Sequence, residues 1–271
     1  MQIRQIIDPR YYQLAVQSSL LIWGMIYLDF SLDLSAITSV IGCALLVQII
    51  FTRYYQLNFN PLSTINSSMS ILLLLHASHF SWLALAIALA IASKFVLRWN
   101  NRHIFNPSNI GIVAVLLFSD STWLASGQWG HSLWWGLLLL GLGLSLFIGF
   151  SRLLSSLSFL VFFASLIFLR ALWLGDNLSI PVHQLQNGAL LIFSFFMLSD
   201  PMTSPNSAMG RVIFGGLLAL IAWILQFTFY IPNAFLYALA LSSPLVIVIN
   251  KISWGKYYHW SQTLTRSKLC E

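Results

Sequence analysis

Charged residues are scarce in this sequence. Lys, Arg, Asp and Glu together make up 7% of its 271 residues, and 58% of the residues are hydrophobic. A soluble globular domain usually carries about 25% charged residues. Because so few charges cannot cover a globular surface, the composition excludes a soluble domain and predicts an integral membrane protein.

Cysteine is also rare, and the familiar catalytic motifs are missing. Cys43 and Cys270 are the two cysteines, so the sequence predicts neither a disulfide framework nor a cysteine-based metal site. His76 and His79 lie close together in the sequence and His131 lies in another loop. A zinc site needs a further ligand near such a pair, and none is visible, so we expect no metal site there either. The sequence contains no P-loop, no GxGxxG fingerprint and no Ser-His-Asp motif. It therefore assigns no catalytic residue and leaves open whether the chain is an enzyme.

The apolar residues occur in runs long enough to cross a bilayer. A membrane-spanning helix needs about 20 residues, so the chain accommodates about ten spans with short loops. We expect an all-α polytopic membrane protein that forms a single membrane domain over residues 1–271. No small-residue cleavage site follows the first apolar run, which we interpret as a retained span rather than a signal peptide. The expected spans are 13–30, 34–52, 62–76, 81–98, 105–123, 132–150, 153–173, 183–199, 211–229 and 233–250.

The basic residues support this span count and predict an orientation. With the N-terminus inside, only Arg170 of the 13 Lys and Arg residues falls on the outer side, as the positive-inside rule predicts. Both termini are therefore expected to be cytoplasmic. Lys94 and Arg170 lie about one turn inside their spans and are expected to snorkel to the interface. Because the net charge of +6 lies at the ends of apolar runs, we expect membrane lipid and no nucleic acid as a partner.

Four of the expected spans open with proline or asparagine and continue through polar residues. They open at Asn60-Pro61, Asn106-Pro107, Pro181 and Pro232-Asn233. Proline suits the first turn of a helix, and interrupted segments at matching positions of two halves indicate a binding site between inverted repeats. We expect two inverted five-helix repeats with broken helices, over about 13–123 and 132–250, and a cytoplasmic tail 251–271. The alternative is a set of ordinary kinked helices in which Ser and Asn join neighbours.

Two polar stretches, residues 98–107 and 199–211, lie at the inner ends of broken spans. Arginines and helix N-termini together form anion sites, so the stretches predict a cytoplasmic site for a phosphate or a flavin. Asp200 is expected within hydrogen-bonding reach of Arg102, directly or through one partner such as Asn106 or Arg211. The alternatives are that Arg102 and Arg211 are positive-inside anchors and that Asp200 caps a turn. The candidate cofactor-binding residues are Arg102, His103, Asn106, Asn109, Asp200, Thr203, Ser204, Asn206 and Arg211.

The same two stretches resemble a known family. Residues 93–118, SKFVLRWNNRHIFNPSNIGIVAVLLF, and residues 195–215, FFMLSDPMTSPNSAMGRVIFG, resemble RnfD, a membrane component of the Rnf electron-transport complex. They are also similar to NqrB, a membrane component of the sodium-pumping NADH:quinone reductase. The segments DPRYYQ (8–13) and SGQWG (126–130) look closest to the branch labelled UnbU. The resemblance implies ten spans in two inverted repeats, a place in the bacterial inner membrane, and flavin-based electron transfer with other membrane or redox subunits.

One departure from the family bears on the cofactor. Flavin-bearing members attach FMN through a phosphoester to a threonine in an S-G-A-T-type motif on the outer face. The matching residues here are Ser126-Gly127-Gln128-Trp129, and tryptophan has no hydroxyl with which to form that bond. The resemblance therefore implies a noncovalent flavin (FMN or riboflavin) or a quinone, and we expect no phosphoester-linked FMN.

Three functions remain open from the sequence. The first is an electron-transfer membrane subunit that holds a noncovalent flavin or quinone. The second is a small-solute transporter or channel on the same inverted-repeat scaffold. The third is a nonredox membrane anchor for a partner complex. The flavin content of the purified protein separates the first function from the other two.

Overall fold

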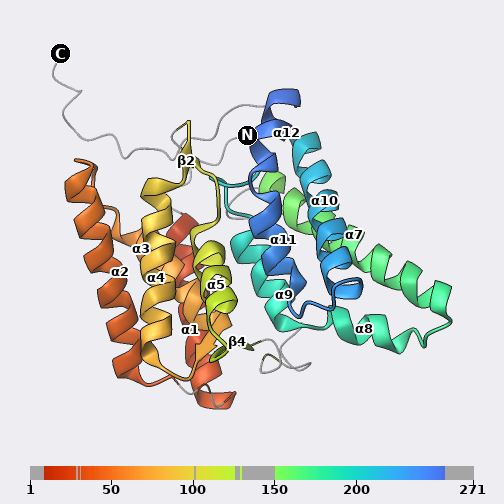
Figure 1. Ribbon diagram of the computed structural model, residues 1–271, viewed down its shortest axis with the longest axis horizontal. Helices are drawn as coiled ribbons and strands as arrows, with labels where there is room; N and C mark the ends of the chain where they lie inside the picture. The colour runs from red at the N-terminus through yellow and green to blue at the C-terminus, as the bar shows by residue number, and fades with distance from the viewer. Residues whose placement is uncertain are drawn as a thin grey trace.

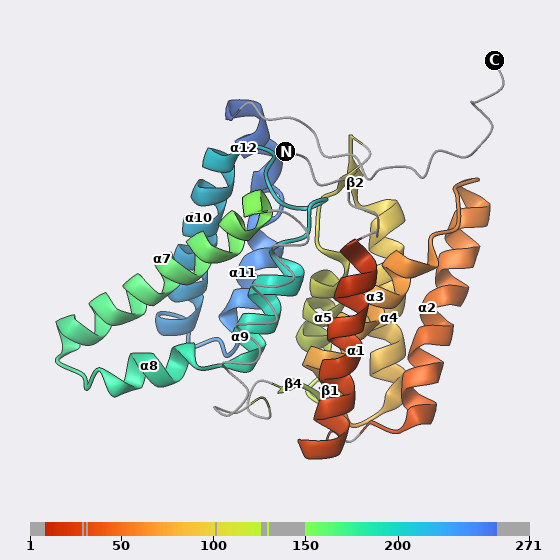
Figure 2. The same ribbon diagram turned by 180° about the vertical axis from the view of Figure 1, so that it is seen from behind.

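The computed structural model describes residues 9–28, 30, 32–100, 102–125, 129 and 150–253. The expected span 132–150, apart from its last residue, and the tail beyond residue 253 lie outside the described residues, as does the segment Ser126-Gly127-Gln128. The described chain is mainly helical, and its helices form two groups that lie side by side (Figure 1 and Figure 2).

The first group contains the N-terminal helices and all the described strands. Its elements are α1 (Pro9–Tyr27), α2 (Leu34–Tyr54), α3 (Pro61–Leu74), β1 (Leu75–Ala77), α4 (Phe80–Val96), β2 (Arg98–Trp99), β3 (Arg102–His103), α5 (Pro107–Phe118) and β4 (Thr122–Leu124). Strand β1 pairs antiparallel with β4, with Leu75 opposite Leu124, so the end of α3 is tied to the segment after α5. Strands β2 and β3 pair as a hairpin between α4 and α5.

The second group contains the C-terminal helices. Its elements are α7 (Phe150–Leu174), α8 (Ser179–Leu185), α9 (Gly188–Ile192), the π-helix η2 (Phe193–Met197), α10 (Ala208–Phe227), α11 (Ala234–Ser242) and α12 (Leu245–Ile252). The two groups meet where α5 contacts α11. There Asn109 Nδ2 donates to the backbone oxygen of Leu236 at 3.1 Å. Since both residues are buried or nearly so, this bond satisfies polar groups inside the seam between the groups.

Several of the described helices are suited to a membrane. Three of them are long and apolar enough to cross it, namely α2, residues Leu153–Leu174 of α7, and α10. A fourth span results if α11 and α12, which are bent by 54° at their junction, count as one. Helices α3, α4 and α5 and the segment Gly188–Met197 are apolar but shorter. The chain is an all-α membrane protein, and the number of ten spans stays a prediction.

Two predicted spans are interrupted at places that the sequence did not indicate. The eighth is predicted to open after Pro181, but Pro181 lies inside α8 and the next helix begins after Asn187. The oxygen of Asn187 accepts the Ala189 N–H at 2.9 Å and caps that helix. The tenth predicted span, 233–250, is two helices, because Pro244 has no N–H to donate to the preceding turn and the chain bends there.

An asparagine immediately precedes each of the short helices α3, α5, α9 and α11. The side-chain oxygens of Asn60 and Asn106 accept backbone N–H groups three residues further on, at 3.4 and 3.1 Å. Asn187 caps α9 in a similar way. Asn233 precedes α11 in the left-handed conformation, with φ of 54°, which asparagine tolerates better than most residues. The same residue type therefore starts the broken helices in both halves of the chain.

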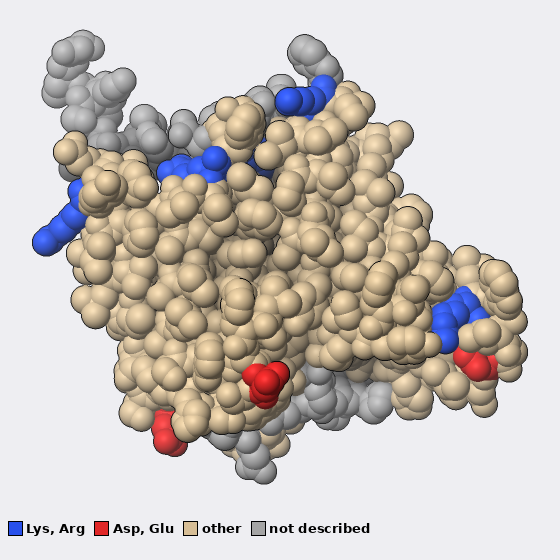
Figure 3. Space-filling model, viewed as in Figure 1, with Lys and Arg blue, Asp and Glu red and all other residues tan. Residues whose placement is uncertain are grey.

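The described Lys and Arg side chains gather at one end of the molecule, the upper end in Figure 3. We call this the basic end; it carries the β2–β3 hairpin and the end of α12 (Figure 1). The acidic side chains seen in Figure 3 lie toward the opposite end. Arg170 is the exception, since it pairs with Asp176 at 3.6 Å and stacks on the Phe227 ring at 4.4 Å. The segregation follows the pattern counted from the sequence, and the end that faces the cytoplasm stays a prediction.

Gly111 allows α4 and α5 to approach closely, and we expect Gly111→Ala to be destabilising. A Cβ atom at this position would clash with the backbone oxygen of Ala86, which packed helices cannot easily move aside. The free energy of unfolding should fall by about 1–3 kcal/mol. Gly42→Ala is the control, because no neighbouring atom of the described residues lies within 4 Å of its Cβ position. Thermal unfolding in detergent compares the two variants, and equal unfolding midpoints would contradict the close approach of α4 and α5 at Gly111.

Candidate functional site

Arg102 joins the two polar stretches that the sequence singles out. Its Nε donates to the backbone oxygen of Met202 at 3.1 Å, and its Nη1 donates to Asn206 Oδ1 at 2.6 Å. Its Nη2 donates to the backbone oxygens of Pro201 and Ser204 at 2.8 and 3.0 Å. A guanidinium from the first group of helices therefore holds residues 200–206, which we call the clasped loop, in the second group.

Asp200 stabilises the clasped loop at its start. Its Oδ1 accepts the Met202 N–H at 3.0 Å. This bond caps a turn, which is the alternative role that the sequence analysis gave for Asp200. Its Oδ2 accepts from Asn106 Nδ2 at 3.5 Å, and the same amide group donates to the backbone oxygen of Met197 at 3.2 Å. Arg102 and Asp200 are thus connected through one partner, as predicted, although the Met202 backbone forms this bridge where Asn106 or Arg211 was expected.

Arg211 holds the other end of the clasped loop. Its Nε and Nη2 donate to the backbone oxygens of Pro205 and Asn206 at 2.9 and 2.8 Å. The side chain is only 6% exposed, and these bonds to carbonyl oxygens offset part of the cost of burying a charge. Thr203 and Ser204 are buried in the same loop.

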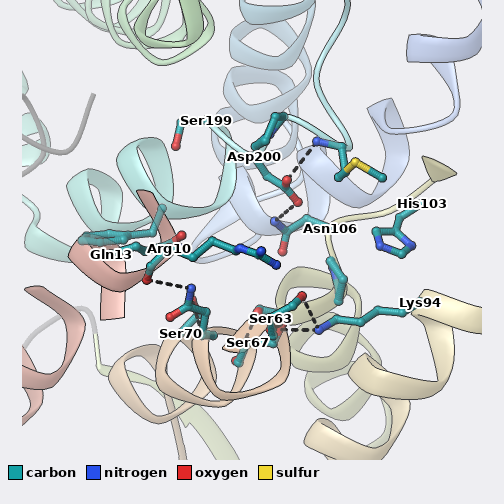
Figure 4. A pocket seen from close by; sticks show the side chains of 16 residues that line it. Arg10, Gln13, Ser63, Ser67, Ser70, Lys94, His103, Asn106, Ser199 and Asp200 are labelled. Atoms are coloured by element: carbon teal, nitrogen blue, oxygen red, sulfur yellow. Dashed lines mark hydrogen bonds between the residues drawn. The ribbon is translucent and has the colours of Figure 1, made fainter. Parts of the chain in front are cut away.

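A cavity of about 100 Å³ lies at the basic end, between the two groups of helices (Figure 4). We call it the basic-end cavity. His103, Asn106 and Asp200 are the candidate residues that line it. The remaining candidates form the clasped loop, hold it in place or contact α11, and they are Arg102, Asn109, Thr203, Ser204, Asn206 and Arg211. The wall also contains residues that the sequence analysis did not select, among them Arg10, Ser63, Asn66 and Lys94.

Lys94 lines this cavity instead of snorkelling to the interface, which corrects the expectation from the sequence. It is 6% exposed, and its Nζ donates to the backbone oxygen and to Oγ of Ser63 at 3.0 and 3.3 Å. Within the described residues, Nζ forms no salt bridge. A buried ammonium without a contacting counter-ion is costly in a low-dielectric site. A lysine in an otherwise apolar run is the sequence signal that points to such a functional position.

Other features add to the positive potential of the basic-end cavity. Arg10 extends across it toward Asn106 and Asp200 (Figure 4). Helices α3 and α5, of 14 and 12 residues, begin beside it, and the N-terminus of a helix carries partial positive charge. Asp200 is the one carboxylate among the described lining residues. The buried oxygen Oδ1 of Asn66 has no donor within the described part of the chain, so the wall also offers an acceptor.

His103 adds no charge to the cavity. Burial, followed by the neighbouring cations Lys94 and Arg98, lowers the pKa of this imidazole to about 3. A hydrogen bond to the Lys94 backbone acts in the opposite direction but does not compensate. The ring is therefore neutral at physiological pH.

Acid is expected to destabilise the protein through His103. Below pH 6.5 the unfolded chain protonates this ring, whereas the folded chain does so only near its pKa of about 3. The free energy of unfolding should therefore fall as the pH decreases through this window, by up to about 1.4 kcal/mol per pH unit. His103→Gln should flatten the dependence of the unfolding midpoint on pH, and the exposed His79, changed to Gln, is the control. An unchanged slope in His103→Gln would exclude this source.

Trp129, which stands where the resemblance places an FMN-bearing threonine, is a core residue. Its side chain is fully buried, and Nε1 donates to the backbone oxygen of Leu73 at 3.2 Å. Its ring meets Phe30 edge-on, with centroids 5.3 Å apart. Because the side chain is buried and has no hydroxyl, this position does not fit a phosphoester-linked flavin.

Comparison with known proteins identifies the family of this chain. The sequence profile of the NQR2, RnfD, RnfE family matches residues 121–258, slightly more than half of the chain. The chain belongs to this family. The segment that matches the NQR2, RnfD, RnfE profile contains the clasped loop, which begins at Asp200, and also Arg211. Arg102 and Lys94 precede the matched segment.

Two members of the family show how far the similarity extends. The chain is 33% identical over 101 residues to the D subunit of the ion-translocating oxidoreductase complex of Citrobacter koseri. It is 33% identical over 102 residues to the protein of the same name from Escherichia coli O7:K1. These matches cover 37% and 38% of this chain and 29% of each relative. The chain thus spans less than a third of the length of these two family members.

Proposed function

We propose that this chain is a membrane subunit of an ion-translocating oxidoreductase complex in the bacterial inner membrane. It takes part in transmembrane electron transfer, with other membrane and redox subunits as partners. Family membership and the names of the two relatives support this proposal. The proposal includes ten spans in two inverted repeats with both termini cytoplasmic. The short helices that follow an asparagine in both halves and the gathering of basic residues at one end support that arrangement.

The basic-end cavity is the observation that carries the redox part of the proposal. A flavin presents carbonyl acceptors and one N–H donor along one edge, and a quinone presents carbonyl acceptors. Lys94 and Arg10 supply donors and positive charge, and Asn66 Oδ1 supplies the matching acceptor. These residues therefore fit the polar edge of a noncovalent FMN or riboflavin. A bound flavin supplies the capacity to accept and pass on electrons.

The chain's own residues would bind this group and bias the charge around it. Lys94 and Arg10, together with the starts of α3 and α5, favour the negative charge that arrives with an electron. Asn106 and Asp200 line the cavity and hold the start of the clasped loop. Five other candidate residues do not line the cavity, and we assign them to the clasped loop, which they form or hold in place. They are Arg102, Thr203, Ser204, Asn206 and Arg211.

A small-solute transporter or channel is the second candidate, because a further cavity lies at the opposite end of the molecule. It has a volume of about 160 Å³ and lies beside the starts of α9 and α11. Four carboxamides of the described residues form its polar wall, and they are Gln184, Asn187, Gln226 and Asn233. Polar cavities beside broken helices are also found in transporters built from inverted repeats, so a polar solute could use the two cavities in turn.

The flavin content of the detergent-purified protein distinguishes these candidates. We expect the purified protein to show flavin absorbance. Denaturation should release all of the flavin, because Trp129 offers no hydroxyl for a covalent bond. Denaturing gels should show no flavin fluorescence, and the intact mass should equal that of the polypeptide. A mass increment equal to FMN would contradict the noncovalent assignment. Purified protein without flavin or quinone would overturn the redox proposal and leave transport or a nonredox anchor.

A further inference from the structure

We propose that a groove at the basic end binds the phosphate of an anionic phospholipid. The groove has a volume of about 90 Å³ and lies between the β2–β3 hairpin and α12. We call it the hairpin groove. Among the described lining residues, it shares only His103 and Met202 with the wall of the basic-end cavity, so this proposal stands independently of the redox function.

The chemistry of the wall selects a negatively charged acceptor. Trp99 Nε1, Asn250 Nδ2 and Lys251 Nζ are donors at this groove that have no acceptor within the described residues. The carboxamide of Asn250 is oriented, because its oxygen accepts the Asn206 N–H at 2.9 Å. No Asp or Glu occurs among the described lining residues. A phosphate, which only accepts hydrogen bonds and carries negative charge, complements this set of donors.

The surroundings of the groove favour a lipid as the source of that phosphate. Ile104, Val246 and Ile247 make part of the wall apolar. Trp99 is 52% exposed, and Ile252 at the end of α12 is 77% exposed. Tryptophan and lysine near the ends of membrane helices lie at the level of the lipid headgroups, and basic pockets between helices bind headgroups there. An acyl chain would follow the apolar residues while the phosphate meets the donors.

Native mass spectrometry of the full chain in detergent tests the proposal with phosphatidylglycerol as the probe. We expect this lipid to stay bound more tightly than phosphatidylcholine, which carries no net charge. Lys251→Gln should weaken phosphatidylglycerol binding about fivefold, the contribution typical of a lysine near an anionic headgroup. Adding Trp99→Phe, which keeps an aromatic ring and removes the N–H, should weaken binding further. Unchanged affinity in the double variant would overturn the proposal.

Arg53→Gln is the matched control, because Arg53 is an exposed cation in the last turn of α2, outside the groove. Its affinity for phosphatidylglycerol should equal that of the unsubstituted protein. An equal loss of phosphatidylglycerol affinity in Arg53→Gln would assign the binding to general surface charge and overturn the hairpin groove as the binding site. Equal affinity for phosphatidylcholine would overturn the anionic requirement. Displacement by inorganic phosphate at the lipid's own concentration would assign the groove to free phosphate and overturn the lipid.

Discussion

Arg102→Ala is expected to lower the free energy of unfolding by about 3–5 kcal/mol, because it removes several hydrogen bonds to a charged group, each of which contributes about 1.5–3 kcal/mol. The change takes the donor from four acceptors at once, three backbone oxygens of the clasped loop and Asn206 Oδ1. Each buried acceptor that loses its donor costs about 1–3 kcal/mol, and water recovers part of this because Arg102 is only partly buried. The midpoint of thermal unfolding in detergent measures the effect.

Two companion variants show whether the geometry or the charge of Arg102 matters. Arg102→Lys keeps the charge but loses the fork of donors, so it should remain clearly destabilised. Arg53→Ala removes an exposed cation at the same end and should change stability by no more than about 0.5 kcal/mol. Similar small losses in all three variants would mean that Arg102 is a surface anchor.

The pair Arg102→Ala and Asp200→Ala should be strongly non-additive. Both side chains hold the clasped loop through Met202, so once one is removed the other has less structure to stabilise. Coupling between residues of one hydrogen-bond network is typically about 0.5–3 kcal/mol. A double variant that loses the full sum of the two single losses would contradict a shared loop.

Lys94→Met is expected to weaken flavin binding at least about tenfold, which corresponds to about 1.4 kcal/mol, without lowering stability. Methionine has a comparable length and fills the same space without a charge. Burying an ion costs several kcal/mol, and removal of this cost offsets the loss of the two hydrogen bonds from Lys94 to Ser63. The ligand, in contrast, loses a charged donor and part of the positive potential of the basic-end cavity.

Riboflavin titrated into the purified protein, followed by quenching of its fluorescence, gives the affinity, and thermal unfolding gives the stability. Lys251→Met is the matched control, because Lys251 lies at the same end but outside the basic-end cavity. It should bind riboflavin like the unsubstituted protein. If Lys94→Met retained riboflavin, or lost as much stability as Arg102→Ala, Lys94 would be a structural residue and the cavity would lose its assignment.

The sequence by itself determined the class of the protein and the position of most helices. Scarce charge and long apolar runs decide how a chain partitions between water and bilayer, and this depends on composition alone. The starts at Asn60-Pro61 and Asn106-Pro107 were also readable, because capping is a local interaction between neighbouring residues. Where two local signals compete, as Pro181 and Asn187 do, the prediction from the sequence chose Pro181 and was wrong, because Pro181 lies inside α8 and the cap at Asn187 starts the next helix.

The meeting of the stretches around Arg102 and Asp200 was also predictable, because both lie at span ends on the same side of the predicted topology. Only the tertiary structure decided what each side chain touches. Arg102 directs its donors at backbone oxygens of the clasped loop, so it frames the cavity instead of lining it. Lys94, one turn inside its helix, can reach the interface or the interior equally well from its own backbone. The packing of α3 against α4 places Ser63 beside its ammonium. A lysine in an apolar run indicates a special position, but neither segment alone shows which residue of the other it will contact.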